Sequence, residues 1–262
     1  MSEHFLQDIT EIYENRNTFR ALVVKNLFGR YKNSAMGFAW HFVIPIMMMV
    51  VYYVVFNTIR ANAIPEFWVF LASGLFPFTF MMENLNRGPG AITSNSEMVK
   101  KMYFPRSILV FSEVASSLII MIIGYSIIIA GMLLTGHVIT VSVIMLPVIL
   151  TSMVLFVTGY VLFLSSVTVY FRDLQYLVNS LSMIFFFITP MYFTLDDVSG
   201  IFEKIILLNP FTYYVEAYHQ IIYYGMYPST SIMIMCAIMP VVSIILGIVV
   251  FRKLRRGFAE RL

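Results

Sequence analysis

The sequence is poor in cysteine and in charged residues. Its 262 residues include one cysteine, Cys236, so no disulfide can form within the chain, and no cysteine and histidine pattern has the spacing of a metal site. Charged residues make up 12% of the chain, whereas a typical soluble domain has about 25%. These shortages exclude a disulfide scaffold, a disordered chain and a cytosolic globular enzyme.

Common catalytic motifs are also missing. No Gly-Lys dipeptide occurs, so the chain has no P-loop to cradle the phosphates of a nucleotide. The ionisable residues within apolar segments, His41, Glu83 and Glu113, are interpreted as structural because each lies near the charged flank of its segment. We therefore expect no catalytic residue, no metal and no cofactor in this chain. A transporter with this composition must conduct passively or take its energy from a separate ATPase.

Apolar residues, by contrast, are abundant. They make up 60% of the chain, and the mean hydropathy is +0.83. Even folded proteins of about 300 residues bury only about three quarters of their chain surface. A soluble domain of this size therefore has no place for so much apolar surface, and the composition indicates an integral membrane protein.

Charge-poor stretches predict six membrane-spanning helices. About 20 apolar residues cross the hydrocarbon core, and the charge-free run from Val114 to Phe171 is 58 residues long. This run suits two spans, with a break at Thr135-Gly136-His137. The predicted fold is an all-α integral membrane protein with spans at 35–59, 67–86, 107–134, 139–170, 174–194 and 231–251.

The lysines and arginines indicate how these spans are oriented. Of the 17, 15 fall on the side of the six spans that carries both termini. The positive-inside rule places that side in the cytoplasm, so we expect a multi-pass protein of the cytoplasmic, or inner, membrane. The expected divisions are a cytoplasmic amphipathic segment at 1–34, a six-span domain at 35–252 and a cytoplasmic basic tail at 253–262.

The N-terminal segment has apolar residues at helical spacing. This pattern predicts an amphipathic helix that lies in the membrane interface. A short helix packed against the protein itself is the alternative. The residues that carry the pattern are Phe5, Ile9, Ile12, Phe19 and Val23.

The second cytoplasmic connection predicts a short helix outside the membrane. Ser94 and Glu97 fit a capping box, in which each side chain satisfies a backbone N–H of the first turn. Pro105 ends the helix, because the residue before proline avoids the α region. The helix would expose apolar surface from Met98, Met102, Tyr103 and Phe104. It either docks into a partner or rests on lipid head groups through Lys100 and Lys101.

The outer connection between the fifth and sixth spans, Thr194 to Thr230, is too apolar for a solvated loop. It holds two short helical stretches, Val198–Leu208 and Phe211–Gly225, separated by Asn209-Pro210. Neither crosses a bilayer comfortably, and irregular backbone at membrane depth survives only when it is buried in protein or lines a wet cavity. A pair of outer re-entrant helices is predicted.

Aromatic residues gather in the outer half of the chain. The ordinary explanation is the aromatic belt at the membrane interface. The alternative is a path for a carbohydrate, because an aromatic ring can stack on the apolar face of a sugar. The candidate path consists of Trp40, Tyr52, Tyr53, Phe56, Phe76, Phe78, Phe80, Tyr192, Tyr213, Tyr214 and Tyr218.

Five short motifs, in order along the whole chain, resemble those of ABC type-2 permeases, the membrane subunits of polysaccharide and polyol-phosphate ABC exporters. Each motif alone is weak, and the order and spacing of the five carry the resemblance. They are the run from Phe28 to Trp40 with the following Pro45, Tyr103-Phe104-Pro105-Arg106, Tyr170-Phe171-Arg172-Asp173-Leu174, Thr189-Pro190-Met191-Tyr192 and Leu208-Asn209-Pro210-Phe211.

The resemblance implies a homodimeric permease that works with two copies of a separate ATP-binding subunit, which would carry ATP and Mg. The N-terminal helix would be an interface helix, and the outer helices would form a gate. The coupling helix, seated in the ATPase, would comprise Glu97, Met98, Lys100, Lys101, Met102, Tyr103 and Phe104.

The implied substrate is a polysaccharide linked to undecaprenyl diphosphate, of the O-antigen, capsule or teichoic acid type, and no nucleic acid is expected as a partner. Arg30 and Lys32 are candidates to meet the diphosphate, with ordinary positive-inside anchoring as the alternative. Two other functions stay open: an ABC type-2 permease for a drug, haem or lipid, and an ion-coupled carrier or membrane enzyme.

Overall fold

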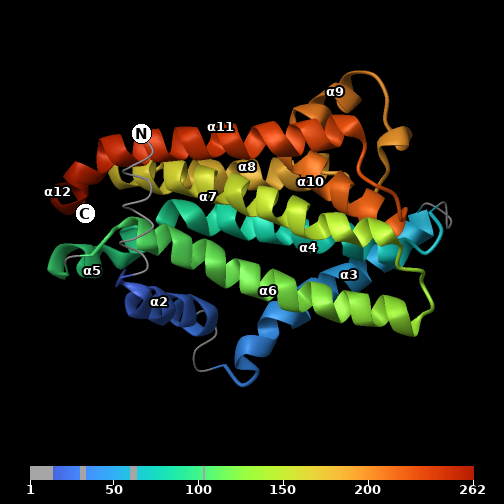
Figure 1. Ribbon diagram of the computed structural model, residues 1–262, viewed down its shortest axis with the longest axis horizontal. Helices are drawn as coiled ribbons and strands as arrows, with labels where there is room; N and C mark the ends of the chain where they lie inside the picture. The colour runs from blue at the N-terminus through green and yellow to red at the C-terminus, as the bar shows by residue number, and fades with distance from the viewer. Residues whose placement is uncertain (1–13, 30–33, 60–63, 103) are drawn as a thin grey trace.

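The computed structural model describes residues 14–29, 34–59, 64–102 and 104–262. Within these ranges all regular secondary structure is helical, which confirms the predicted all-α fold. The long helices run side by side along the molecule (Figure 1). They are α3 (Trp40–Ile59), α4 (Phe67–Arg87), α6 (Ser107–Leu134), α7 (Leu146–Tyr170) and α11 (Thr230–Leu254).

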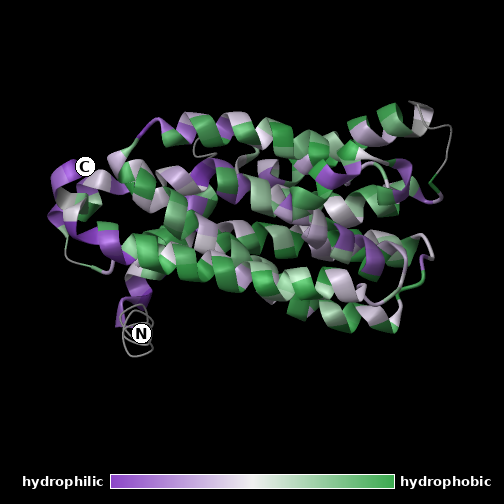
Figure 2. Cartoon of the chain, turned by 90° about the horizontal axis from the view of Figure 1, so that it is seen from above, coloured by the Kyte–Doolittle hydropathy of each residue, from purple (hydrophilic) through white to green (hydrophobic). Residues whose placement is uncertain are grey.

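Shorter helices occupy the ends and the gaps between the long ones. We call the end that carries α2, α5 and α12 the basic end, because it holds Lys25, Lys100, Lys101 and Arg106; it is on the left in Figure 1. In Figure 2 hydrophilic segments gather at this end, while the long helices are mostly hydrophobic. The shorter helices are α2 (Arg16–Gly29), α5 (Ser96–Lys101), α8 (Leu174–Ile188), α9 (Ile201–Leu208), α10 (Pro210–Tyr218) and α12 (Phe258–Arg261).

Helices occur at all six predicted span positions, but four of the described stretches are long and apolar enough to cross a membrane. Polar residues in its last turns, including Glu83 and Arg87, make α4 less apolar than these four. The fifth predicted span ends early, because Thr189 is extended before Pro190. With 15 residues, α8 is about 22 Å long, shorter than the hydrocarbon core. The four stretches are Gly37–Phe56, Ser107–Leu134, Val141–Tyr170 and Thr230–Gly257.

The closest helix pair is α7 and α11, and small residues allow it. A Cβ atom added to Gly159 would lie 2.3 Å from the backbone carbon of Ser243, and one added to Gly247 would lie 2.3 Å from the Gly159 oxygen. The Ser243 hydroxyl donates a hydrogen bond to the Phe156 carbonyl across the same contact, at 2.7 Å. Because Gly159 and Gly247 have no side chains, the backbones of α7 and α11 can approach each other closely, as in other membrane helix pairs.

Two prolines inside helices, Pro77 and Pro240, are compensated by hydroxyls on neighbouring helices. Pro77 in α4 has no N–H for the carbonyl four residues earlier, and that carbonyl, on Ser73, accepts a hydrogen bond from the Tyr125 hydroxyl of α6 at 2.9 Å. Pro240 in α11 likewise releases the Cys236 carbonyl, which accepts from the Ser152 hydroxyl of α7. Both bonds satisfy backbone groups for which a lipid environment offers no partner.

This arrangement makes a testable prediction for Tyr125→Phe. The variant leaves the buried Ser73 carbonyl without its donor, which should lower the free energy of unfolding by about 1–3 kcal/mol. In a Pro77→Ala background the alanine N–H supplies the missing donor, so the same substitution should cost much less. A double-mutant cycle of unfolding in detergent measures the difference. Equal costs in both backgrounds would show that Tyr125 stabilises the bundle by packing alone.

The connection between α8 and α11 contains two helices, as predicted, but with different bounds. α9 begins after Gly200, whose φ is +72°, and its surface is largely exposed. α10 is buried against α4, α7 and α11. The Asn209 side chain starts α10 by accepting from the Phe211 N–H at 3.0 Å, and it donates to Thr189 at 2.8 Å. The predicted second helix does not reach Gly225 as an α-helix, because it widens to a π-helix over His219–Tyr223.

The π-helix is held to two neighbouring connections at the end opposite the basic end. The Tyr223 hydroxyl donates to the Pro65 carbonyl at 2.7 Å, and the Thr140 hydroxyl donates to the Gly225 carbonyl at 3.0 Å. Burial raises the pKa of Tyr223, and the nearby Glu66 carboxylate adds to the rise. The phenol therefore stays protonated and keeps donating.

Candidate functional site

A cavity of about 420 Å³ lies between α3, α4, α6 and α8. Five residues of the predicted carbohydrate path line it, so the structure brings together aromatic residues from two separate helices. The remaining lining includes the apolar side chains of Met48, Met121 and Met183. The five predicted residues are Trp40, Tyr52, Phe76, Phe78 and Phe80.

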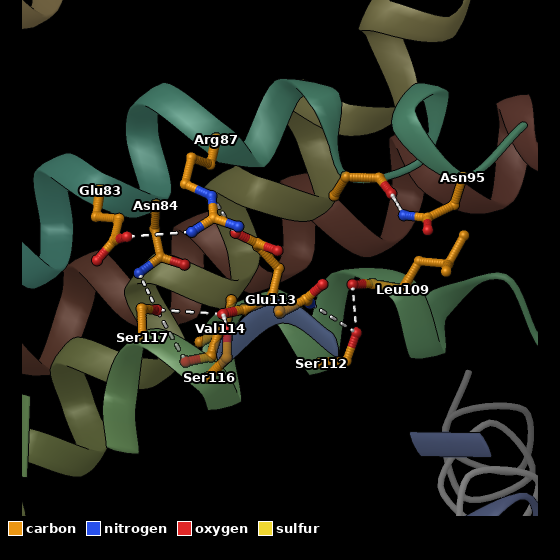
Figure 3. A network of polar contacts seen from close by, with 12 residues as sticks. Glu83, Asn84, Arg87, Asn95, Leu109, Ser112, Glu113, Val114, Ser116 and Ser117 are labelled. Carbon is orange, nitrogen blue, oxygen red and sulfur yellow. Dashed lines mark hydrogen bonds and ion pairs between the residues drawn. The ribbon is translucent and has the colours of Figure 1, made fainter. Parts of the chain in front are cut away.

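One wall of the cavity is polar. Glu83, Asn86 and Arg87, from the last turns of α4, line the cavity together with Ser117 of α6. Figure 3 shows how the residues around Arg87 converge. We call Glu83, Arg87 and Glu113 the charged cluster. The site therefore combines aromatic faces with hydrogen-bonding groups, which is the combination that a sugar ring with its apolar face and hydroxyl rim requires.

Arg87 holds the charged cluster together. Its Nε atom lies 2.8 Å from the Glu113 carboxylate of α6, and one of its terminal nitrogens lies 3.2 Å from Glu83. The Arg87 side chain is 31% exposed and that of Glu113 is 10% exposed. Beside the cluster, the Asn84 amide donates to the Ser117 hydroxyl at 2.7 Å. These contacts fix the ends of α4 and α6 relative to each other.

A run of aromatic rings leads from the cavity toward the opposite end. Phe186 of α8 lies 5.7 Å from Tyr52 and 6.0 Å from Phe78 between ring centroids. Tyr52 lies 6.3 Å from Phe56, which stacks on Tyr192 at 4.4 Å. Four predicted residues and one that was not predicted, Phe186, thus form a continuous aromatic run.

The other predicted path residues lie apart from the cavity. Tyr214 and Tyr218 of α10 are fully buried inside the bundle, where they contact Phe156 and Tyr125. The Tyr213 hydroxyl donates to the backbone of α9. Tyr53 is exposed on α3 and stacks on Phe67. In the described structure these four side chains contact the protein or its apolar exterior rather than the cavity.

A short helix is present where the coupling helix was predicted, but it is shorter than expected. It covers Ser96–Lys101 instead of 97–104, because Met102 is extended and Phe104 turns inward into the core. Met102 is exposed, Met98 is half-buried, and Tyr103 lies outside the described residues. Lys100 is exposed, and Glu97 pairs with Lys101 at 2.5 Å. The apolar surface that this helix exposes is therefore smaller than the sequence predicted.

The predicted capping box before this helix is wrong. The residue that precedes α5 is Asn95, whose side chain makes no capping hydrogen bond. A 3₁₀ turn, Thr93–Asn95, leads directly into the helix, so the Ser96 N–H bonds to the Thr93 carbonyl instead. The Asn95 amide donates to Ala91 at 2.8 Å and its oxygen accepts from Lys25 at 2.6 Å. This second bond ties α2 to the turn before α5.

The N-terminal segment is described in part. Residues 1–13 lie outside the described residues, as do the two candidate diphosphate contacts, Arg30 and Lys32. α2 packs along α6 and buries Leu22, Val23 and Leu27. Val24 and Phe28 stay exposed on another face. The described part of this segment is thus packed on the protein and still presents apolar side chains outward.

Two contributions to the site were missed from the sequence. The partnership of Arg87 with Glu113 joins residues 26 positions apart, and no local spacing predicts it. Phe186 lies in a run of three phenylalanines that reads as an ordinary apolar span. Among the described residues no group of His, Cys, Asp and Glu has the arrangement of a metal site.

Comparison with known proteins agrees with the motif order. The chain is 28% identical over 254 residues to the O-antigen export system permease protein RfbA of Myxococcus xanthus, covering 96% of this chain and 98% of that protein. It is 29% identical over 248 residues to a protein of the same name from Klebsiella pneumoniae, covering 92% and 95%. A family model described as the ABC-2 type transporter matches residues 17–223. Because this match extends from α2 through the π-helix, the chain belongs to the ABC-2 type transporter family.

Proposed function

We propose that the chain is the permease subunit of an ATP-driven exporter that moves an undecaprenyl-diphosphate-linked polysaccharide, of the O-antigen type, across the cytoplasmic membrane. The observation that carries the proposal is similarity along nearly the whole chain to two permeases named for O-antigen export. In this proposal the basic end faces the cytoplasm, since lysine and arginine favour that side. The five long helices and the shorter α8 then cross or enter the bilayer, with α9 and α10 on the outer side.

The energy for export must come from another subunit. The chain has no P-loop, so we assign ATP and Mg to a separate ATPase present in two copies, one for each permease of a homodimer. α5 is the proposed contact, because it lies at the basic end, exposes Lys100 and is followed directly by the exposed Met102. α6 follows α5 after Pro105, so a push on α5 reaches the bundle directly.

The cavity and its aromatic run are the proposed surface for the glycan. Stacking on Trp40, Tyr52 and Phe78 tolerates different sugars, because every pyranose ring has an apolar face. Glu83, Asn86 and Arg87 offer donors and acceptors for hydroxyl groups at one end of the cavity. A polymer can slide along such a surface, because each individual contact is weak.

Reconstitution tests the function. The chain is purified with the proteins that accompany it in its native membrane and placed in proteoliposomes with undecaprenyl-diphosphate-linked polysaccharide on the ATPase side. We expect ATP-dependent arrival of the polymer on the other side. Copurification without any P-loop protein, or transport driven by a proton gradient alone, would overturn the proposal. ATP-driven movement of a drug, haem or phospholipid with no movement of the polymer would favour a different ABC-2 substrate.

The contact at α5 makes a separate prediction. Met102→Asp places a charge where an apolar side chain should enter the ATPase, and it should lower ATP-driven export about tenfold, as expected for an interface anchor. Met226→Asp is the matched control, because Met102 is 56% exposed and Met226, at the opposite end, is 55% exposed. Equal export by the two variants would show that Met102 does not contact the ATPase.

A further inference from the structure

A second cavity, of about 570 Å³, lies at the basic end. Its walls come from the turn before α5, the last turns of α7, the first turns of α8 and Leu262, which follows α12. We call it the basic-end pocket. Its lining is polar, unlike that of the aromatic cavity, and includes Ser94, Ser96, Thr168, Arg172, Gln175 and Asn179.

Most of these polar groups are not used by the protein itself. Within the described part of the chain, the side chains of Ser94, Ser96, Gln175 and Asn179 make no hydrogen bond with one another or with the backbone. Arg172 forms no ion pair among the described residues. The pocket therefore presents one guanidinium and several hydroxyl and amide groups to whatever enters it.

The pocket lies beside the turn that joins α7 to α8. α7 ends at Tyr170 and α8 begins at Leu174, so the chain turns around at this level. Three aromatic side chains beside the pocket, Tyr170, Phe171 and Tyr176, are exposed. Exposed aromatic residues at the ends of membrane helices mark the boundary between hydrocarbon and head groups. A ligand of the basic-end pocket is therefore reached from the membrane surface.

We propose that the basic-end pocket binds the phosphate or diphosphate head group of a membrane lipid, with Arg172 as the charged donor. A planar guanidinium donates two parallel hydrogen bonds to phosphate oxygens, and the surrounding hydroxyl and amide groups donate to the remaining oxygens. The inference goes beyond the proposed function, because it requires a phosphate-bearing lipid but not a glycan. Ser96 is the first residue of α5, so a bound head group also touches the helix proposed to contact the ATPase.

The test compares Arg172→Gln with Arg256→Gln in the complex of permease and ATPase. Arg256 is exposed at the same end and does not line the pocket, so it controls for the loss of one positive charge. Native mass spectrometry measures binding of three probes: undecaprenyl diphosphate, phosphatidylglycerol and inorganic pyrophosphate. We expect Arg172→Gln, but not Arg256→Gln, to weaken binding of a phosphate-bearing lipid about tenfold. Asn179→Ala should weaken it to a smaller extent.

The three probes separate the possible sources of the phosphate. Arg172-dependent binding of undecaprenyl diphosphate alone identifies the head group of an export substrate, whereas equal dependence with phosphatidylglycerol identifies an ordinary membrane lipid. Binding that is unchanged in both pocket variants would overturn the proposal, as would Arg172-dependent binding of pyrophosphate alone. Loss of the ATPase from the Arg172→Gln complex, with lipid binding intact, would overturn the proposal and show that the pocket contacts the ATPase instead of a lipid. Failure of glycan export with retained Arg172-dependent lipid binding would reject the proposed function and leave this inference standing.

Discussion

Gly159→Ala is expected to separate α7 from α11, whereas Gly131→Ala is expected to leave the protein folded. The new methyl group at position 159 would overlap the backbone of α11, which cannot move aside as a flexible side chain does. Overpacking of this kind costs about 3 kcal/mol. Gly131 is also helical but has no atom within 4 Å of an added Cβ, so alanine there should gain up to about 1 kcal/mol from helix propensity.

The single cysteine reports on this helix pair. Cys236 is buried on α11, and its reaction with a maleimide requires α11 to leave its neighbours. We expect Gly159→Ala to label many times faster than the parent protein in detergent, and Gly131→Ala to label at the parent rate. Equal labelling rates for the two variants would mean that the α7 and α11 backbones are not in close contact.

Arg87→Met is expected to destabilise the bundle by removing the guanidinium that contacts the mostly buried Glu113 carboxylate. Removing one member of a buried ion pair costs about 3–5 kcal/mol. Because Arg87 is partly exposed, we expect the lower end of that range. Glu113→Gln in the same background should restore most of the loss, since a neutral amide tolerates burial better than a carboxylate.

An exposed pair in the same chain supplies the control. Glu97 and Lys101 are closer together than Arg87 and Glu113, yet both side chains are exposed. Lys101→Met should therefore change the free energy of unfolding by less than about 0.5 kcal/mol. Unfolding in a denaturing detergent compares the variants. A similar small change for Arg87→Met would show that water reaches Glu113 freely.

The sequence predicts most of the helices because the membrane imposes a simple rule on them. A charge-free run must be helical and long, and the predicted bounds of α6, 107–134, agree with the structure. The rule fails where a local residue intervenes. Pro190 ends the fifth helix early, and the 3₁₀ turn before α5 replaces the predicted capping box.

The site residues could be predicted from the sequence where the interacting residues lie close together along the chain. Glu83 and Arg87 are one turn apart on a helix, so their contact could be predicted, whereas Glu113 joins them through the packing of α4 on α6. Aromatic residues on α3 and α4 were predicted as a path, and five of them line one cavity. The tyrosines of α10 carry the same composition signal, but the burial of that helix decides where their side chains lie.

The bond from Tyr125 to α4 also works as a mechanical linkage. α6 begins close to α5. Tyr125 lies 18 residues after Ser107 on this helix, which corresponds to about 27 Å along its axis. The Tyr125 hydroxyl there donates to the Ser73 carbonyl of α4, which Pro77 leaves without its usual backbone donor. A shift of α6 would therefore act directly on the part of α4 that lines the aromatic cavity.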